Sequence, residues 1–484
     1  MNENYRKARY DRNDPFSIFD YSKYLIGESL SSLFGDEVGE HFFKGKGGLG
    51  QMVEELFFKY EVNSNREADF KEAGVELKCT PLLKKADETY RIKERLVCTM
   101  IDYYEIAKTS FEDSHLISKC RLMLLLFYLH VYGKKNYEYE FLFRVLWQLP
   151  EKDLMLIKQD YDLIAEKVRK GEAHLLSEGD TVYLGACRKG QKGDNLQSQP
   201  FSEIKAKKRA FSLKPAYTRY ILETVEKSGN SYYSNYTAPH KEAVSLVDVQ
   251  ELQSRTFEKV ILDRFRPFMG MDYLQICRKL GIKPYQAKNK YADIVSLIGS
   301  DKKTKRLSQA EEFIKSGISL KTVRLSQTGM PRESMSFKNI DYCEVAENAE
   351  WEDSELYELF TNRFMFVVFK PVAGETITIQ NNRTGEAETD QRYVLDKIFF
   401  WTMPQTDLED AKYYWENIRA NVLANHIEAK FFWSLKDHKK FHVRPKAAKA
   451  KDRTVNPNGG EAYKYCYWFN AEYIKQIIDS ESND

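Results

Sequence analysis

The chain has 484 residues, enough for two or three ordinary domains. Its 42% hydrophobic and 30% charged residues fit a folded globular protein and exclude a disordered chain. A net charge of only +2 identifies no partner, so a surface for nucleic acid must come from local clusters of cations.

The cysteines and the apolar segments indicate the cellular compartment of the protein. The seven cysteines are scattered, odd in number and without a C-x-x-C pair, which favours reduced thiols over a zinc site or disulfides. The polar start of the chain lacks the apolar run of a signal peptide. The longest apolar run, residues 122 to 132, is too short to span a membrane and predicts a buried strand. We therefore expect a cytoplasmic protein with no membrane partner.

The first informative element is a helix predicted over residues 48 to 60, "GLGQMVEELFFKY". The preceding "GKGGLG" satisfies the dinucleotide-binding pattern G-x-G-x-x-G, with Asp69 further along. However, no clear strand precedes the glycines and a polar turn precedes Asp69, which argues against nucleotide binding. A loop that carries Lys44 and Lys46 toward a phosphate and a solvated turn both remain open.

The next element is "DFKEAGVELK", residues 69 to 78. Its last five residues alternate as a strand, so that Glu76 and Lys78 share one face and Val75 and Leu77 the other. Metal-dependent nucleases use this pattern with an upstream acid such as Asp69. The alternative is a half-exposed strand with a surface ion pair worth less than about 1 kcal/mol.

Phosphodiester hydrolysis explains why these residue types would be needed together. Mg²⁺ neutralises charge on the phosphate oxygens and activates a water, and it prefers one or two carboxylate ligands. Asp69 and Glu76 could supply those ligands, and Lys78 could orient or help deprotonate the water and stabilise the transition state. Glu54, on the preceding helix, could touch the metal or its water.

The chain also contains an internal repeat on either side of a linker-like segment, residues 226 to 243. "FEDSHLISKCRLMLLLF", "GVELKCTPL" and "RAFSLKPAYTRYIL" are echoed in the same order by "WEDSELYELFTNRFMFVVF", "GISLKTVRL" and "YCYWFNAEYIKQII". This order predicts a duplicated mixed α/β domain, the alternative being chance similarity between apolar strands.

The second copy lacks the acidic residues of the first. Ser319 and Ser296 stand where Glu76 and Glu54 do, Glu312 replaces Asp69, and Lys321 keeps the lysine. Because serine cannot hold Mg²⁺ as a carboxylate does, we expect one copy to cut and the other to have lost that ability.

Two basic segments, residues 203 to 214 and 436 to 453, close the two halves. Mixed Lys, Arg and aromatic residues are typical of surfaces that follow a phosphate backbone, although many such runs are only solvated faces.

Taken together, these motifs resemble MutH, the mismatch-repair endonuclease that nicks DNA at GATC. The resemblance lies in "KGGLGQMVEELFF…ADFKEAGVELKCTPL", "FEDSHLISKCRLMLLL", "KRAFSLKPAYTRYIL" and, in the second half, "GISLKTVRLSQTGMPRESMSF" and "HVRPKAAKAKD". A doubled chain of this length is similar to the Sau-three-A-I family of type II restriction endonucleases, which cut double-stranded DNA before the G of GATC.

The resemblance implies an α/β fold of two tandem restriction-endonuclease-like domains, each a mixed sheet flanked by helices. The catalytic domain would span residues 1–228, a linker 229–245, and a DNA-binding effector domain without a complete catalytic site 246–484. It further implies Mg²⁺-dependent double-strand cuts that leave 5′-phosphates, two copies of DNA as partners, and a free monomer that dimerises on DNA.

The resemblance also assigns roles to individual residues. Asp69, Glu76, Lys78 and Glu54 would be catalytic, with the metal held by Asp69, Glu76 and the backbone carbonyl of Leu77. The residues expected to bind DNA are Lys46, Lys119, Arg188, Lys189, Lys207, Lys208, Arg209, Ser212, Lys214, Arg444 and Lys446. Arg444, in the family's Arg-Pro-Lys segment, would read guanine in the major groove.

Two departures from MutH favour a restriction enzyme. The Arg-Pro-Lys segment is absent from the first half, which has Cys187, Arg188 and Lys189 there, and Ser212 replaces a tyrosine associated with sensing adenine methylation. A strand-nicking repair endonuclease and a non-catalytic DNA-binding regulator remain the alternatives.

Overall fold

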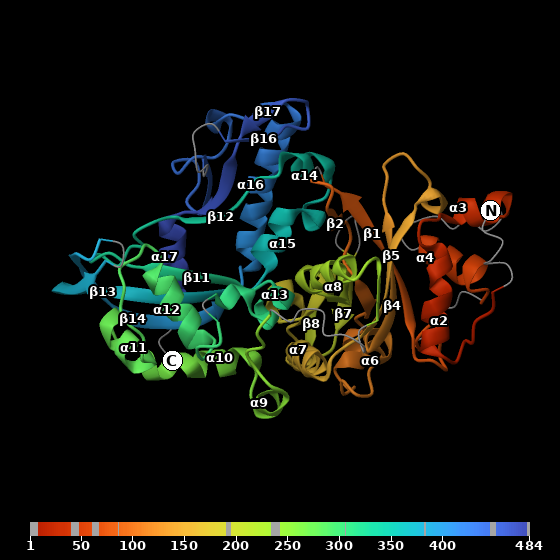
Figure 1. Cartoon of the computed structure of the whole chain (residues 1–484), viewed down its shortest axis with the longest axis horizontal. Helices are drawn as coiled ribbons and strands as arrows, with labels where there is room; N and C mark the ends of the chain where they lie inside the picture. Colours follow the sequence, from red (N-terminus) through yellow and green to blue (C-terminus); the bar gives the residue numbers. More distant parts are fainter. Residues whose placement is uncertain are drawn as a thin grey trace. The chain divides into compact units, whose positions relative to one another are not determined.

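The computed structural model describes residues 8–39, 48–60, 67–85, 87–189, 195–233, 243–304, 306–381, 384–445 and 452–481. These residues form two compact units, coloured red to yellow-green and green to blue in Figure 1. The first unit holds the described residues up to Ala243 together with Asp248–Gln253 and Ile314–Gly317. The second holds Val244–Val247, Ser254–Phe313 and the chain from Ile318 onward.

The first unit is built on a five-stranded mixed sheet in the order β10-β5-β4-β1-β2. Its central strand β4 is the apolar run predicted to be buried; it pairs in parallel with β1 and antiparallel with β5 (Figure 1). Being covered on both faces, β4 needs apolar side chains at every position. The bounds are β1 Glu76–Lys84, β2 Tyr90–Ile92, β4 Leu122–Leu129, β5 Phe141–Gln148 and β10 Ser231–Tyr233.

Two smaller sheets and the helices complete this unit. One sheet has the order β3-β9-β6, and the other is the hairpin β7-β8. The bounds of these strands are β3 Val97–Met100, β6 Leu184–Arg188, β7 Leu196–Gln199, β8 Ser202–Lys207 and β9 Arg209–Leu213. The helices are α2 Pro15–Tyr21, α3 Leu30–Phe34, α4 Gly48–Met52, the π-helix η3 Val53–Phe57, α5 Tyr103–Ile106, α6 His115–Cys120, α7 Glu151–Arg169, α8 Pro215–Lys227 and α9 Val249–Ser254, with short 3-10 turns between them.

The core of the first unit explains why β1 is positioned firmly. Val75, Leu77, Leu124 and Leu126 lie on the sheet face that packs against buried side chains of α2, α3, α4 and η3. The alternation predicted for "GVELK" therefore orients this strand, and Glu76 and Lys78 face the opposite side.

The second unit repeats this topology. Its largest sheet, β11-β13-β14, pairs β11 in parallel with β13 and β13 antiparallel with β14, as β1, β4 and β5 do. A 19-residue helix follows in both units, α7 in the first and α16 in the second. The bounds are β11 Ser319–Arg324, β12 Met335–Asn339, β13 Phe364–Gln380, β14 Ala387–Trp401, β15 Phe441–Pro445, β16 Arg453–Val455, β17 Glu461–Tyr463 and β18 Tyr465–Phe469. The helices are α10 Phe257–Phe265, α11 Tyr273–Leu280, α12 Lys290–Gly299, α13 Glu311–Ser316, α14 Tyr342–Glu347, α15 Glu355–Thr361, α16 Gln405–Leu423 and α17 Ala471–Ser480.

The smaller sheets correspond as well, since β12-β18-β15 has the same succession as β3-β9-β6, and hairpin β16-β17 matches β7-β8. The chain is thus a mixed α/β protein in which one arrangement of strands and helices occurs twice. The predicted linker is shorter than expected on its N-terminal side, because β10 pairs in parallel with β5 as part of the first unit.

The segment Ile314–Gly317 lies in the first unit although the chain on either side of it belongs to the second. Lys315 is held there by Asp153 of α7, with 2.6 Å between its Nζ and the carboxylate Oδ2, and the two side chains are 1% and 0% exposed. The hydroxyl of Tyr217 donates to the same oxygen at 2.6 Å. This buried ion pair fixes the segment in place.

Within the described residues, no helix combines the length and the apolar character that a membrane crossing needs.

Candidate active site

A tight turn places Asp69 beside the start of β1. Phe70 and Val75 exchange backbone hydrogen bonds of 2.9 and 3.2 Å, and Gly74 takes a φ of +65°, which favours glycine. The chain therefore doubles back, and the Asp69 Oδ2 accepts a hydrogen bond from the Leu77 amide at 2.8 Å. This turn explains why the acid needs its particular spacing from the Glu-x-Lys strand.

Glu76 is the buried centre of the site, with only 2% of its surface exposed. Its Oε1 accepts from the Lys78 ammonium at 2.6 Å, and its Oε2 accepts from the Lys119 ammonium at 2.9 Å. Burial alone would lower the pKa of Lys78, but the Glu76 carboxylate outweighs it and leaves that pKa raised. Because Glu76 is buried, its pairing with Lys78 is not the solvated surface ion pair that was the alternative.

Lys119 joins the two carboxylates. Its Nζ lies 2.9 Å from Glu76 Oε2 and 3.7 Å from Asp69 Oδ1, and the side chain is 12% exposed. It stands on α6, which leads into β4, and the parallel register of Glu76 with Met123 brings this helix beside the acids. The sequence predicted Lys119 as a DNA contact, and the structure places it among the acids.

Glu54 comes from the π-helix η3, a form that often occurs at functional sites. The pKa of Glu54 is raised to about 7, first by burial and then by the nearby Asp69 and Glu76 carboxylates, while Lys78 and Lys119 oppose this rise. Three acids therefore face two lysines, and burial together with the Asp69 charge also raises the pKa of Glu76.

This donor set fits a divalent cation. The Lys119 ammonium already occupies the position of a cation shared by Asp69 and Glu76, and two carboxylates are what Mg²⁺ prefers. The described residues contain no group of three or more His, Cys, Asp or Glu side chains that could hold a metal ion. Such a site leaves positions for waters and a phosphate.

We expect Glu54→Gln to stabilise the metal-free protein at pH 8 but not at pH 5. Because the pKa of Glu54 is raised to about 7 from its ordinary 4.5, folding stability falls as the pH rises through this window. Glutamine carries no charge at either pH, so the variant avoids this loss of folding stability, which is roughly 2 kcal/mol for a partly exposed group. Thermal unfolding in EDTA at pH 5 and pH 8 measures this change in stability. Glu72→Gln, at an exposed position, is the control. An equal effect of Glu54→Gln at the two pH values would contradict a raised pKa of Glu54.

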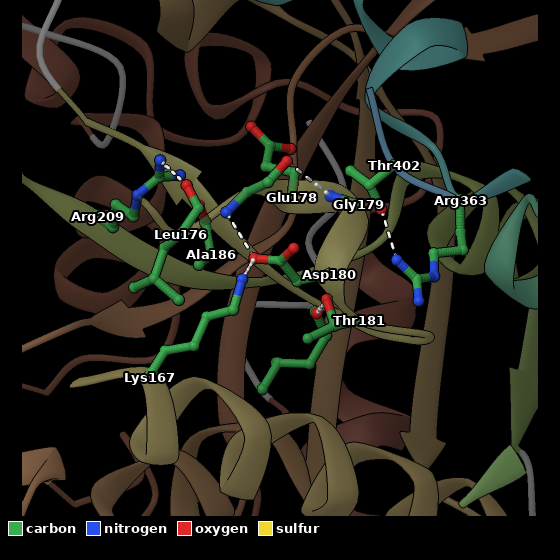
Figure 2. Close-up of polar contacts among 12 residues, drawn as sticks. Lys167, Leu176, Glu178, Gly179, Asp180, Thr181, Ala186, Arg209, Arg363 and Thr402 are labelled. Atoms are coloured by element: carbon green, nitrogen blue, oxygen red, sulfur yellow. Dashed lines mark hydrogen bonds and ion pairs between the residues drawn. The ribbon is translucent and has the colours of Figure 1, made fainter. Parts of the chain in front are cut away.

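Three residues of the first basic segment that were predicted to bind DNA are buried, and Figure 2 shows the contacts of one of them, Arg209. Arg209, 4% exposed, donates to the carbonyl of Ala186 at 2.5 Å and to that of Leu176. Lys214 donates to the carbonyl of Glu178, and Ser212 lies inside the same central strand, β9. Their described contacts support the sheet β3-β9-β6.

The cations exposed at the surface of this region include Lys189 and Lys208, and Arg188 and Lys207 lie half-buried beside them. The Lys189 amide donates to the Lys208 carbonyl at 3.0 Å, so the ends of β6 and β8 present these side chains together. Lys46 and Lys446, also predicted to bind DNA, lie outside the described residues.

In the second unit the equivalent site has no acidic pair. Lys321 lies over the Phe337 ring, 4.1 Å from its centroid, and the Glu312 carboxylate accepts hydrogen bonds from the Leu246 amide and the Ser245 hydroxyl, each at 2.9 Å. Ser296 is buried and Ser319 half-buried. Leu359 follows the shared Glu-Asp-Ser turn where Lys119 does in the first unit.

Arg444 is exposed at the end of β15, with its guanidinium 4.3 Å from the Trp468 ring centroid. Stacking of this kind holds a guanidinium in a defined plane while its N–H groups remain directed outward. The side chain predicted to read guanine is therefore available at the surface of the second unit.

Sequence comparison extends these observations to known proteins. A family model described as the DNA mismatch repair enzyme MutH matches residues 58–160, which include Asp69, Glu76, Lys78 and Lys119. The type II restriction enzyme Sau3AI of Staphylococcus aureus is 30% identical over 510 residues, covering 96% of this chain and 98% of that protein. The DNA mismatch repair protein MutH of Shewanella sp. (strain MR-7) is 25% identical over 220 residues, covering 43% of this chain and 94% of that protein.

The match to the restriction enzyme runs through both units, whereas the MutH protein covers less than half of the chain. The resemblance recognised in the sequence motifs is thereby confirmed. The chain belongs to the MutH-like family of type II restriction endonucleases that includes Sau3AI, and it is a site-specific deoxyribonuclease acting on DNA.

Proposed function

We propose that this endonuclease cuts both DNA strands before the G of GATC, with Mg²⁺, and leaves 5′-phosphates. The convergence of Asp69 and Glu76 on one cation, the Lys119 ammonium, carries the proposal of a metal-dependent site. When bound there, Mg²⁺ would polarise the phosphate and lower the pKa of a water.

The residues of the chain have distinct roles in this proposal. Asp69, Glu76 and the Leu77 carbonyl would hold the metal, and Lys119 would then turn from the two acids toward the phosphate. Lys78 stays protonated and stabilises negative charge in the transition state, so it acts as a cation rather than as a base. Glu54, with its pKa near neutral, accepts a hydrogen bond or a proton from the attacking water.

In the proposed division of labour the first unit, which includes β10, cuts DNA, and the second unit is the effector domain. The loss of the acids at Ser296 and Ser319 and of the lysine at Leu359 supports a second unit that binds DNA without cutting it. With one cutting site per chain, a double-strand break needs either two chains or two sequential nicks. We propose a monomer that dimerises on DNA, with a second GATC copy acting as allosteric effector through surfaces such as Arg444.

The decisive experiment is digestion of supercoiled plasmids that carry one or two GATC sites, with Mg²⁺ or with EDTA. We expect linear products with 5′-phosphate ends at GATC, faster cutting of the two-site plasmid, and no cutting in EDTA. Open circles as the final product would instead indicate a nicking repair enzyme. Absence of cleavage with every divalent metal would indicate a DNA-binding regulator.

A further inference from the structure

Tyr60 follows the π-helix that carries Glu54 and turns back toward it. Lys59 takes a left-handed φ of +54°, and the Tyr60 amide then donates to the Glu54 carbonyl at 3.2 Å. The Tyr60 ring packs against Phe70, the neighbour of Asp69, with 5.1 Å between ring centroids. Tyr60 is therefore fixed from two sides next to the catalytic acids.

The hydroxyl of Tyr60 is buried and has no hydrogen-bond partner among the described residues. Burial raises the pKa of Tyr60, and the negative charges of Asp69, Glu54 and Glu76 raise it further. The hydroxyl thus remains a protonated donor at any pH at which the protein works. A buried donor without an acceptor destabilises the fold, so such groups invite a functional explanation.

The second unit offers an internal comparison. Asp301 there has a left-handed φ of +49° after helix α12, matching Lys59, and the next residue is Lys302, which is exposed. The phenolic hydroxyl is therefore missing from the unit in which serine replaces Glu54 and Glu76. If Tyr60 served only to pack the end of this helix, its loss would have no reason to accompany the loss of the acids.

We propose that Tyr60 is a positioning residue whose hydroxyl donates a hydrogen bond to the water that attacks the phosphodiester. This inference rests on the proposed function of Glu54, Asp69 and Glu76. The hydroxyl oxygen is too enclosed to meet a DNA backbone. Tyr60 keeps its proton throughout, and no bond to it forms or breaks.

The test compares Tyr60→Phe with Tyr10→Phe, because the Tyr10 hydroxyl is half-buried nearby but already donates to the Phe58 carbonyl at 2.6 Å. We expect Tyr60→Phe to lower kcat about tenfold, the effect of one hydrogen bond in the transition state, without changing KM or DNA affinity. Its melting temperature in EDTA should equal or exceed that of the wild type, since an unpartnered hydroxyl is removed. Tyr10→Phe should melt earlier and keep its kcat within about twofold.

A third variant, Glu76→Gln, tests the proposed catalytic site separately from the role of Tyr60. If Glu76→Gln cleaves as fast as the wild type, the proposed catalytic site itself is wrong. If Glu76→Gln is inactive but Tyr60→Phe keeps its full kcat, only the role of Tyr60 is overturned. A Tyr60→Phe defect confined to KM, or one accompanied by a lower melting temperature, also overturns it, since these results indicate DNA contact or packing.

Discussion

Glu76→Gln is expected to lower the rate of DNA cleavage by at least about a thousandfold while leaving DNA binding in place. Glutamine keeps the size of the side chain but removes the charge that Asp69 and Glu76 together offer to a cation. It also leaves Lys78 and Lys119 without their shared partner, only 2.6 and 2.9 Å from the substituted group. Single-turnover cleavage of a GATC duplex, with binding measured in Ca²⁺, separates the two effects.

The chain supplies its own control for this experiment. Ser319 occupies the position of Glu76 in the second unit, at the start of β11. Ser319→Ala should leave the cleavage rate within about twofold, because that site has no acidic pair to lose. Comparable losses from Glu76→Gln and Ser319→Ala would contradict the assignment of cutting to the first unit alone.

Lys315→Met is expected to destabilise the protein by about 3–5 kcal/mol. Lys315 and Asp153 are 2.6 Å apart and fully buried, so the substitution removes the cation that lies against this carboxylate in a region from which water is excluded. The Tyr217 hydroxyl still donates to Asp153 but carries no charge to neutralise it. Urea unfolding followed by circular dichroism measures the change, and the first unfolding transition should shift to lower urea.

A surface pair on the same helix provides the comparison. Lys158 and Glu112 are 2.7 Å apart, yet their side chains are 41% and 58% exposed. Lys158→Met should cost less than about 1 kcal/mol, since water screens both charges before and after the change. Equal effects of Lys315→Met and Lys158→Met would mean that the buried pair is solvated in solution.

Sequence reasoning predicted the parts of the site that depend on local pattern. The alternation around Glu76 and Lys78, the turn before it and the apolar strand β4 follow from short-range chemistry, and the structure has all three. It also has the repeated arrangement of strands that the echoed segments predicted.

The remaining parts depend on contacts between distant segments. Lys119 lies far from Glu76 in the chain, and only the parallel register of β1 with β4 brings them together. The one signal available was the replacement of Lys119 by Leu359 after the shared turn. Likewise, nothing in the basic run distinguishes the buried Arg209 and Lys214 from the exposed Lys208, because strand position decides their burial.

The placement of Ile314–Gly317 in the first unit bears on how this protein can be dissected and recombined. A fragment ending at the linker would contain Asp153 but not Lys315, and would lose this buried ion pair. A graft of the second half onto a foreign nuclease would carry Lys315 without Asp153. The two halves are therefore not interchangeable modules. When they are exchanged between homologues, Asp153 and Lys315 must be exchanged together.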